Sequence, residues 1–379
     1  MLSSPLNVRM ILTALVARTP LYLEGEPGVG KTATVETVAR WLNRPLVTII
    51  GATRDRTDFG GWPRYDEGAG RVRLHPFPWV QQLVDAGSAG ILFIDEMNSN
   101  EEIFPVLLRV LAERYIGDIP FAGDVLAAGN PEELSVAGLT LPPPVANRVI
   151  HYRWQTSARQ WADGMRKGFD HLMGDPPPLP PEEVVRARVA EAKALVAAYV
   201  ERNPHALLQV NLNRPHGPWP SPRSWDLLAR FLGAAWALGM DEEVQALGVQ
   251  GAVGEGGLNF LVFLRSLDLP PVEEVLENPG RLPKREDAAF VTLMAVARHV
   301  AEEPSPERWT KAWKLLGHVA RERQADLAAR AAYELIELYK GLPGPKKARL
   351  PLPREPIQAF KPLVDELRAM SSLEGGGLA

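Results

Sequence analysis

The stretch Leu21-Tyr22-Leu23-Glu24-Gly25-Glu26-Pro27-Gly28-Val29-Gly30-Lys31-Thr32 decides the fold of this chain. From Gly25 onward it matches G-x-x-x-x-G-K-[ST], whose glycines let backbone N–H groups curl around a phosphate. An apolar run precedes the pattern and a helix-forming stretch, residues 33–42, follows it. This is the strand–loop–helix setting that a phosphate-binding loop requires. A glycine-rich turn that matches by chance is the alternative, and the flanking strand and helix argue against it.

Length and composition bound the possibilities. A chain of 379 residues suggests two or three domains. With 42 basic and 46 acidic residues, the net charge of −4 gives no general attraction to nucleic acid or to anionic membranes. We expect no membrane span and no signal peptide, since Arg9 and Arg18 interrupt the apolar N-terminus, and therefore a cytoplasmic protein. The absence of cysteine excludes disulfides and thiolate metal sites.

Two further apolar runs end in polar residues. Ile91 to Ile94 is followed by Asp95 and Glu96, and the run 125–129 is followed by Asn130. In a parallel sheet both ends lie at the carboxyl edge, where ligands bind. Asp95 could then hold Mg²⁺ through water, Glu96 could orient or deprotonate an attacking water, and Asn130 could bond the γ-phosphate. Taken singly, Asp95-Glu96 is often only a solvated strand end, and Asn-Pro is more often only a turn. Together with a phosphate loop in the same domain, Asp95-Glu96 becomes a strong signal.

Residues 58–73 are polar and glycine-rich and carry Arg64, Arg71 and Arg73. The pattern predicts a hairpin inserted into the domain, and a solvated surface loop fits the composition equally well. Farther on, Ser221 is a credible N-cap with Pro222 at the first helical position, so a helix is expected to begin there.

The order of these motifs resembles the AAA+ ATPases and, within them, the MoxR group. The resemblance covers roughly residues 1–240 and leaves the last third of the chain mostly unexplained. The phrases that carry it are the phosphate loop, Ile94-Asp95-Glu96-Met97-Asn98, Leu107-Leu108-Arg109-Val110-Leu111-Ala112-Glu113-Arg114, Ala128-Gly129-Asn130-Pro131 and Ser221-Pro222-Arg223. After Asn98 the group usually continues with a basic residue and prolines, whereas this chain has Ser99-Asn100-Glu101, which puts contacts with other subunits and clients in doubt.

The resemblance implies an α/β fold with three parts. An AAA+ αβα core with a parallel sheet occupies residues 1–155 and carries the hairpin insert at about 58–73. A helical lid with the sensor 2 arginine occupies 156–270. A further all-α region with a proline-rich linker (342–356) and a disordered tail occupies 271–379, and Trp309 and Trp313 in it are expected to pack between helices.

The resemblance also assigns site residues. ATP would be bound by Glu26, Pro27, Gly28, Val29, Gly30, Lys31, Thr32 and Ala33, and Mg²⁺ by Thr32 and Asp95. Glu96 would activate water and Asn130 would be sensor 1. Arg148 would be the arginine finger that reaches a neighbouring subunit's γ-phosphate, with Arg114 in reserve, and Arg223 would be sensor 2, acting in cis. Arg148 could instead be an ordinary surface arginine that pairs with a carboxylate, but its place after a proline-rich loop and before a strand favours the finger.

The implied function is a ring-forming ATPase, hexameric by resemblance, that hydrolyses ATP to ADP and phosphate. It would use this energy to remodel or mature a partner protein or to insert a metal or cofactor into it, and a partner with a von Willebrand A-type domain is expected. Two alternatives remain open. A nucleic-acid motor would need a basic track with aromatic residues, of which only the hairpin arginines give a hint. A nucleotide-gated scaffold with little turnover would commonly lack one of the groups that are intact here.

Overall fold

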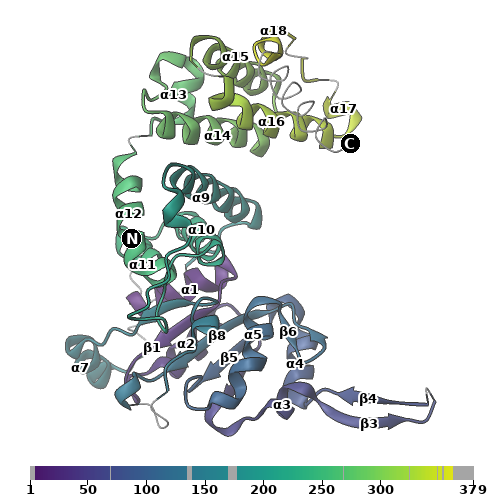
Figure 1. Ribbon diagram of the computed structural model, residues 1–379, viewed down its shortest axis with the longest axis vertical. Helices are drawn as coiled ribbons and strands as arrows, with labels where there is room; N and C mark the ends of the chain where they lie inside the picture. The colour runs from purple at the N-terminus through teal and green to yellow at the C-terminus, as the bar shows by residue number, and fades with distance from the viewer. Residues whose placement is uncertain are drawn as a thin grey trace, which may run out of the picture. The chain divides into compact units, whose positions relative to one another are not determined.

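A computed structural model describes residues 5–68, 70–134, 139–169, 177–267, 269–323, 325–347, 349–351 and 354–361. The chain forms two compact units, Met1–Lys193 with Asn203–Leu261, and Ala194–Arg202 with Val262–Ala379 (Figure 1). The expected disordered tail and most of a predicted last helix (360–370) lie outside the described residues. The three-part division predicted from the sequence stays a prediction, because compactness alone does not separate a lid from a core.

The first unit contains a five-stranded sheet in which every neighbouring pair is parallel, in the order β2-β5-β8-β1-β9. Its strands are β1 (Leu21–Glu24), β2 (Leu46–Ile50), β5 (Ile91–Asp95), β8 (Asp124–Gly129) and β9 (Ile150–Arg153). Leu21 is in register with Leu126 on one side and with Ile150 on the other. The carboxyl ends of β1, β5 and β8 therefore meet at one edge, as the sequence predicted, and the α/β class is confirmed.

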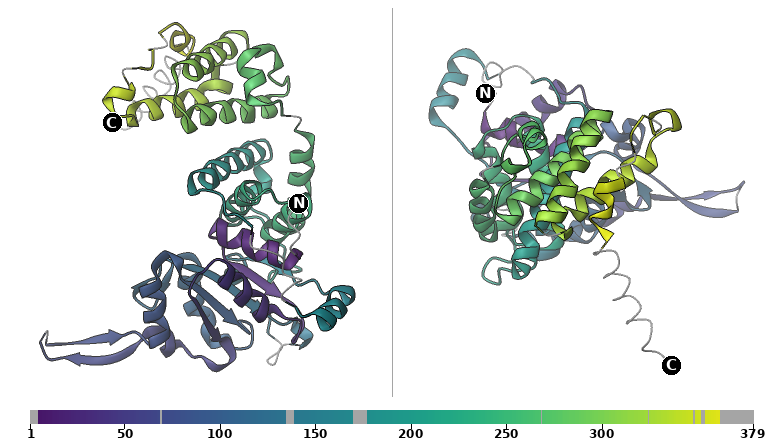
Figure 2. Two further views of the ribbon diagram at one scale, coloured as in Figure 1. Left: turned by 180° about the vertical axis from the view of Figure 1, so that it is seen from behind. Right: turned by 90° about the horizontal axis from the view of Figure 1, so that it is seen from above.

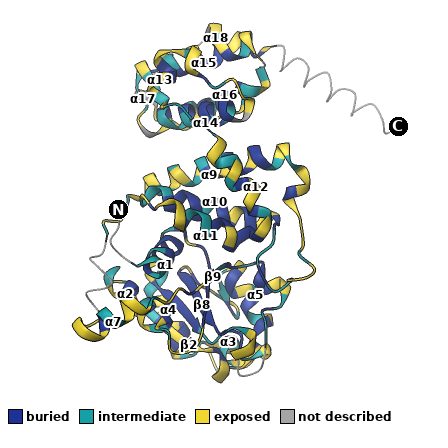
Figure 3. Ribbon diagram, turned by 90° about the vertical axis from the view of Figure 1, so that its left-hand side faces the viewer, coloured by how far each residue is buried: buried dark blue, intermediate teal, exposed yellow. Residues whose placement is uncertain are grey.

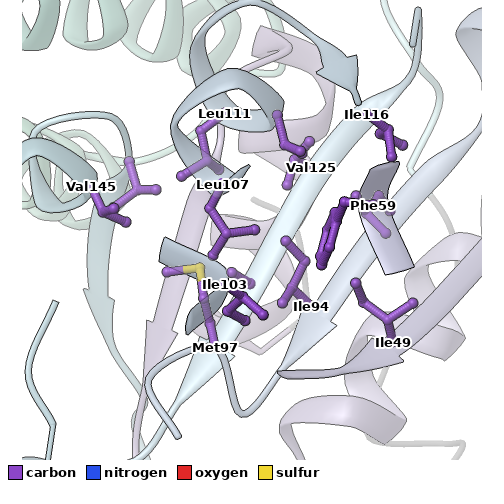
Figure 4. Close-up of a cluster of buried hydrophobic side chains, with 14 of the residues drawn as sticks. Ile49, Phe59, Ile94, Met97, Ile103, Leu107, Leu111, Ile116, Val125 and Val145 are labelled. Carbon is purple, nitrogen blue, oxygen red and sulfur yellow. The ribbon is translucent and has the colours of Figure 1, made fainter. Parts of the chain in front are cut away.

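One face of the sheet is covered by helices that share a hydrophobic cluster with it. Leu92 and Ile94 of β5 pack there with Leu107 and Leu111 of α5, Phe59 of α3 and other buried side chains (Figure 4). The helices on this face are α3 (Arg56–Gly60), α4 (Pro78–Ala86), α5 (Phe104–Ala112) and α6 (Pro143–Ala146). The other face carries α1 (Leu6–Ala17) and α2 (Lys31–Trp41), which pack against each other (Figure 2). Short 3₁₀ turns lie at Gly51–Thr53, Gly87–Ala89, Glu101–Ile103 and Glu132–Leu134.

An antiparallel hairpin of β3 (Trp62–Asp66) and β4 (Arg71–His75) extends away from the sheet (Figure 1). It begins and ends slightly later than the sequence suggested, since residues 58–60 belong to α3. A capping box starts α3 at Asp55, whose carboxylate accepts the N–H of Thr57 and whose N–H donates to the carboxylate of Asp58, and this explains the shift. A second, very short hairpin joins β6 (Tyr115–Ile116) and β7 (Ile119–Pro120).

The rest of the first unit is helical. Its elements are α7 (Ala158–Lys167), α9 (Glu182–Arg202, shared with the second unit), a 3₁₀ turn at Pro204–Leu207, α10 (Pro222–Ala237), α11 (Glu242–Val253), a 3₁₀ turn at Gly254–Gly256 and the start of α12 (Gly257–Ser266). The helix predicted at Ser221 is confirmed, because Ser221 and Ser224 bond each other's backbone N–H in a capping box.

We expected no apolar stretch long enough to span a bilayer. This was wrong, because residues 242–266 are long and apolar enough to do so by length and composition alone. In the structure this stretch is two helices, α11 and α12, separated by a 3₁₀ turn. Val244, Val249 and Val253 are fully buried within the unit, and α11 packs against α10 and β9. The apolar character of α11 is thus accounted for by packing within the folded protein, whereas Leu258 and Val262 of α12 are exposed.

The second unit is all-helical among its described residues. It contains α13 (Val272–Glu277), a 3₁₀ turn at Pro279–Arg281, α14 (Glu286–Glu302), α15 (Pro306–Glu322), α16 (Ala325–Gly341), α17 (Gly344–Lys347) and α18 (Arg354–Gln358). α17 falls within the predicted linker, and α18 begins in it and ends two residues beyond it. Trp309 and Trp313 are buried at the centre of the unit's hydrophobic cluster, as predicted, and the burial pattern of the helices is seen in Figure 3.

Candidate functional site

The phosphate loop links the end of β1 to the first turn of α2. Gly28 and Gly30 have φ angles of 80° and 91°, which disfavour residues with a side chain. Gly25 is packed closely, since a Cβ there would lie 2.6 Å from Cβ of Trp154. The Trp154 indole N–H donates to the carbonyl of Val29 at 3.2 Å. The loop conformation is therefore set by glycines and fixed from one side by a tryptophan that directly follows β9.

Lys31 is buried at the base of this loop, with 7% of its surface exposed. Its ammonium donates to the carbonyls of Gly25 at 2.6 Å and Glu26 at 3.0 Å, and to Oδ1 of Asn130 at 3.4 Å. Burial lowers the pKa of Lys31, and the nearby carboxylates, Asp95 foremost, oppose that shift. The lysine is thus held between the loop and the end of β8.

Thr32 and Asp95 meet at the carboxyl edge of the sheet. The Thr32 hydroxyl donates to Oδ2 of Asp95 at 2.6 Å, and the other carboxylate oxygen accepts the backbone N–H of Glu96 at 2.9 Å. No group of three His, Cys, Asp or Glu side chains among the described residues could hold a metal by itself. A Mg²⁺ bound with a nucleotide needs few protein ligands, because phosphates and water supply the rest. One hydroxyl and one carboxylate in contact fit that requirement.

Glu96 lies at a tight turn just beyond β5. Its φ angle is 53°, a left-handed conformation that is uncommon for residues other than glycine. The turn is held on one side by the N–H of Met97, which donates to the carbonyl of Ala128 at 2.8 Å. On the other side Gly51 approaches so closely that a Cβ there would lie 2.7 Å from the Glu96 carbonyl oxygen. The surrounding backbone therefore holds this carboxylate at the edge of the sheet.

Asn98 is a positioning residue to which the sequence analysis gave no role. It is 2% exposed, and its amide donates to the carbonyls of Asn130 at 2.8 Å and Leu139 at 2.9 Å. Its Oδ1 accepts the N–H of Asn130 at 3.1 Å. Asn98 therefore fixes the backbone of Asn130 on both sides. The only signal in the sequence was its place two residues after the paired carboxylates.

The structure does not bring Arg148 and Arg223 to the phosphate loop of their own chain. Arg148 precedes β9, whose first residue is in register with Leu21 at the opposite end of β1 from the loop. At about 3.3 Å per strand residue, the loop begins roughly 13 Å farther along. The positive charge of Arg223 also acts on Arg148, since it adds to burial in lowering the Arg148 pKa, while the carboxylate of Glu113 opposes the shift.

Asn147 explains why these two arginines are neighbours. Its amide donates to the carbonyl of Trp219 at 3.1 Å, and its Oδ1 accepts the hydroxyl proton of Ser221 at 2.7 Å. The start of α10, which carries Arg223, is thereby tied to the residue directly before Arg148. The cis role of Arg223 as sensor 2 stays a prediction.

Arg114, the reserve candidate for the finger, is held by its own subunit. Its guanidinium donates to the carbonyls of Gly123 and Arg18, both at 3.1 Å. Burial lowers its pKa to about 10, with the charges of Arg230 and Arg18 adding to the shift and Asp124 opposing it. These contacts fit a structural role at the amino edge of the sheet better than a free finger.

Two cavities border this part of the fold. One, of about 310 Å³, lies between the start of α1 and the segment after β9 and is lined by Pro5, Leu6, Asn7, Arg9, Gln155, Thr156, Ser157, Gln160 and Glu243. The other, of about 530 Å³, lies between β1, β9 and α11, and its lining includes Asn98, Asn130 and His151. The Nε2–H of His151 donates to the Ala146 carbonyl at 2.9 Å, and burial lowers the pKa of the ring to about 4.

Comparisons with known proteins agree with this geometry. Residues 20–148 match the family model described as AAA domain (dynein-related subfamily). Over 110 residues the chain is 30% identical to Protein MoxR of Methylorubrum extorquens. The matched region covers 29% of this chain and 31% of that protein. Over 109 residues it is 28% identical to Protein MoxR of Paracoccus denitrificans, 28% of this chain and 31% of that protein. The chain thus spans about a third of the length of the curated relatives that it matches.

Solved structures were compared as well. A crystal structure described as that of a candidate ATPase from Cytophaga hutchinsonii gives a TM-score of 0.41 with 18% identity. It covers 65% of this chain and 80% of that one.

Proposed function

We propose that this chain, an AAA+ ATPase of the MoxR group, hydrolyses ATP at sites completed by a second copy of itself. The observation that carries the proposal is the division of its charged groups between two edges of one sheet. Lys31, Thr32 and Asp95 lie together at the carboxyl edge. Arg148 and Arg223 lie together beyond the amino end of β9. A neighbouring subunit that brings its arginines to this carboxyl edge would complete the site.

The nucleotide would be ATP with Mg²⁺. Residues Glu26 to Ala33 would surround its phosphates with backbone N–H groups at the start of α2, where the helix dipole favours an anion. Thr32 and Asp95 would hold Mg²⁺, which when bound neutralises charge on the phosphates. The cavity of about 310 Å³ is lined by Gln155, the neighbour of the Trp154 that bonds the loop, and it would take the base and ribose.

Glu96 would act as the general base for the attacking water. A carboxylate held at the edge of the site can accept a proton from water as the bond to phosphorus forms. Asn130, whose backbone is fixed by Asn98 and whose Oδ1 contacts Lys31, would orient the water or the γ-phosphate. The positively charged ammonium of Lys31 would contact the phosphoryl group that is transferred.

Arg148 and Arg223 would both act on the nucleotide of the neighbouring subunit. A guanidinium supplied in trans neutralises charge that develops on the phosphoryl group, and this makes hydrolysis depend on assembly. The arrangement described above supports a trans role for Arg223 in place of the cis role expected from the sequence. A closed ring satisfies such head-to-tail contacts, and a hexamer is the ring we propose.

The proposal extends to what the ring does with the energy of ATP. By its similarity to MoxR proteins, the ring would remodel or mature a partner protein or assist metal or cofactor insertion. A partner with a von Willebrand A-type domain is part of this proposal.

The test is ATPase rate against protein concentration for the wild type, Glu96→Gln and Arg148→Ala, with mass measured by light scattering in the presence of ATP. We expect specific activity to rise as rings form. Glu96→Gln should bind ATP and hydrolyse it about 10²-fold more slowly. Arg148→Ala should assemble and hydrolyse at least about tenfold more slowly. Activity that is independent of concentration, with a fully active Arg148→Ala variant, would refute the shared-site mechanism.

A further inference from the structure

The hairpin of β3 and β4, called the arm below, exposes large apolar side chains. Trp62, Tyr65, Val72 and Leu74 are 68%, 60%, 62% and 51% exposed. The arm extends away from the domain (Figure 2), and its ten strand residues are exposed apart from Asp66, which is half-buried. Aromatic and branched residues that gather on an exposed surface usually mark a site of interaction.

The strand register separates these side chains into two different faces. Directly paired residues of an antiparallel hairpin point to the same side. Trp62 with His75, Arg64 with Arg73 and Asp66 with Arg71 therefore form one face, and Pro63 with Leu74 and Tyr65 with Val72 form the other. On the first face, three arginines outnumber the one aspartate, which pairs with Arg73 at 2.9 Å. The arm thus has a cationic face and an apolar face.

The outer edge of β4 is open to a further strand. β3 and β4 form a two-stranded sheet with no third strand among the described residues. β3 contains Pro63, which lacks an N–H and blunts its outer edge, whereas β4 contains no proline. Two-stranded sheets are only marginally stable in water, so a third strand would stabilise the arm as well as bind to it.

We propose that the edge of β4 binds an extended segment of a partner protein in which acidic and apolar residues alternate. Added as a third strand, such a segment would set its acidic side chains beside Arg71 and Arg73 and its apolar side chains beside Val72 and Leu74. Backbone hydrogen bonds would hold the segment, and the alternation would select it. The inference rests on the proposed function only in taking the partner to be a protein. The binding itself needs no ATP hydrolysis.

Two other occupants fit the arm less well. A nucleic acid would use the cationic face alone and leave Tyr65, Val72 and Leu74 uncovered, and it would approach a chain of net charge −4. A second copy of the arm paired edge to edge through β4 would set arginines against arginines and histidines, and like charges across a strand pair are destabilising. An acidic, alternating segment satisfies both faces and the edge.

The experiment measures binding of fluorescent peptides to the full chain by anisotropy. One peptide alternates Glu and Val, a second replaces every Glu by Lys, and a third has the composition of the first with its Glu and Val residues in separate blocks. We expect the first to bind at least about tenfold more tightly than the other two. N-methylation of alternate backbone amides along the edge that faces β4 should abolish its binding.

A charge exchange separates recognition from misfolding. The double variant Arg71→Glu with Arg73→Glu should lose at least about tenfold in affinity for the Glu peptide and gain at least about tenfold for the Lys peptide. A gain of binding cannot come from an unfolded arm. The matched control is Arg186→Glu with Arg188→Glu, two exposed arginines at the same spacing on α9. It should leave both affinities unchanged.

The remaining outcomes each overturn the inference. If the alternating and block peptides bind equally well, the segment is not bound as a third strand. Tight binding of single-stranded DNA or RNA that the double variant abolishes, with no peptide binding, would assign the cationic face to nucleic acid. Loss of rings on deleting residues 62–75, with no peptide binding, would assign the arm to a second copy. ATPase activity in the double variant should equal that of the wild type, so failure here leaves the proposed function to its own test.

Discussion

The guanidinium groups of Arg148 and Arg223 lie close enough that the charge of one lowers the pKa of the other. Nε of Arg148 is buried without a hydrogen-bond partner among the described residues, and one of its terminal nitrogens donates to the carbonyl of Pro144 at 2.5 Å. The carboxylate of Glu113 opposes this effect more weakly, so a further anion would relieve the repulsion between the two like charges. A phosphate presented by a neighbouring subunit would be such an anion.

Mixing two inactive variants tests whether these arginines act in trans. Lys31→Ala should disable the nucleotide site of a subunit but leave its arginines intact, and Arg223→Ala should do the reverse. We expect each variant alone to lose at least about tenfold in ATPase rate. Mixed rings should recover activity, because some intact sites then face an intact arginine. Arg148→Ala should behave in the same way.

The exposed Arg188 provides a control, since Arg188→Ala should be fully active alone. If Arg148→Ala is rescued by Lys31→Ala but Arg223→Ala is not, Arg223 acts in cis, and its position beside Arg148 would have to change on assembly.

Thr32 and Asp95 lead to a prediction about magnesium. Thr32→Val keeps the shape of the side chain but removes the hydroxyl that donates to Asp95. We expect the Mg²⁺ concentration for half-maximal ATPase activity to rise at least about tenfold, because one of two protein groups for the ion is gone. Thr34→Val on the same helix removes a hydroxyl that bonds only the carbonyl of Gly30, and should leave the Mg²⁺ requirement unchanged. Equal requirements in all three proteins would contradict the assignment.

Asn98 should affect turnover through Asn130. Asn98→Asp replaces two amide donors by a carboxylate oxygen that repels the carbonyls of Asn130 and Leu139. We expect kcat to fall about tenfold or more with little change in KM, together with a loss of about 1–3 kcal/mol in the free energy of unfolding. Asn100 also bonds the backbone through both ends of its amide, to Arg54 and Glu102. Asn100→Ala should reduce stability and leave kcat in place, and a kcat loss equal to that of Asn98→Asp would argue for a general structural effect.

His151 makes stability depend on pH. Its pKa is about 4 in the folded protein because burial disfavours the charged ring, against about 6.5 in an unfolded chain. Between these values the unfolded state binds a proton that the folded state does not, so stability falls as pH drops from about 6.5 to about 4. The full difference corresponds to about 3 kcal/mol, and partial exposure of the ring reduces it to roughly 1–2 kcal/mol.

Unfolding by urea at several pH values, for the wild type and His151→Gln, would measure this contribution. The difference in free energy of unfolding between the wild type and His151→Gln should decrease by roughly 1–2 kcal/mol as the pH falls from about 6.5 to about 4. His318→Gln, at an exposed histidine, should show a pH dependence like that of the wild type. A difference that stays constant with pH would show that His151 does not titrate in this range.

The sequence predicted the parts of the fold that short patterns determine. A glycine-rich loop between a strand and a helix, and strands that end in polar residues, place Lys31, Asp95 and Asn130 at one edge whatever the rest of the chain does. Their contacts with one another follow from that local logic. The helix beginning at Ser221 was predictable for the same reason, because a capping box is a local signal.

What depends on distant contacts was not predictable. Asn98 looks like any polar residue after a strand until its bonds to Asn130 and Leu139 are seen. The position of Arg223 depends on the bonds from Asn147 to the segment before α10, which join residues more than 70 positions apart. The apolar stretch 242–266 looks the same in sequence whether it is buried in a protein or in lipid, since both environments select the same side chains.

The left-handed backbone of Glu96 sets stability against activity. Only glycine adopts that conformation without strain, so the native glutamate costs the folded protein about 1 kcal/mol or more at this position. Glu96→Gly should therefore unfold at a temperature equal to or above that of the wild type while losing hydrolysis, whereas Glu96→Gln should lose hydrolysis with no gain in stability. Without a requirement for turnover, mutation would tend to replace this glutamate and make the protein more robust. A carboxylate at a backbone position that costs stability is expected where function requires it, so the strain at Glu96 supports its proposed place in the reaction.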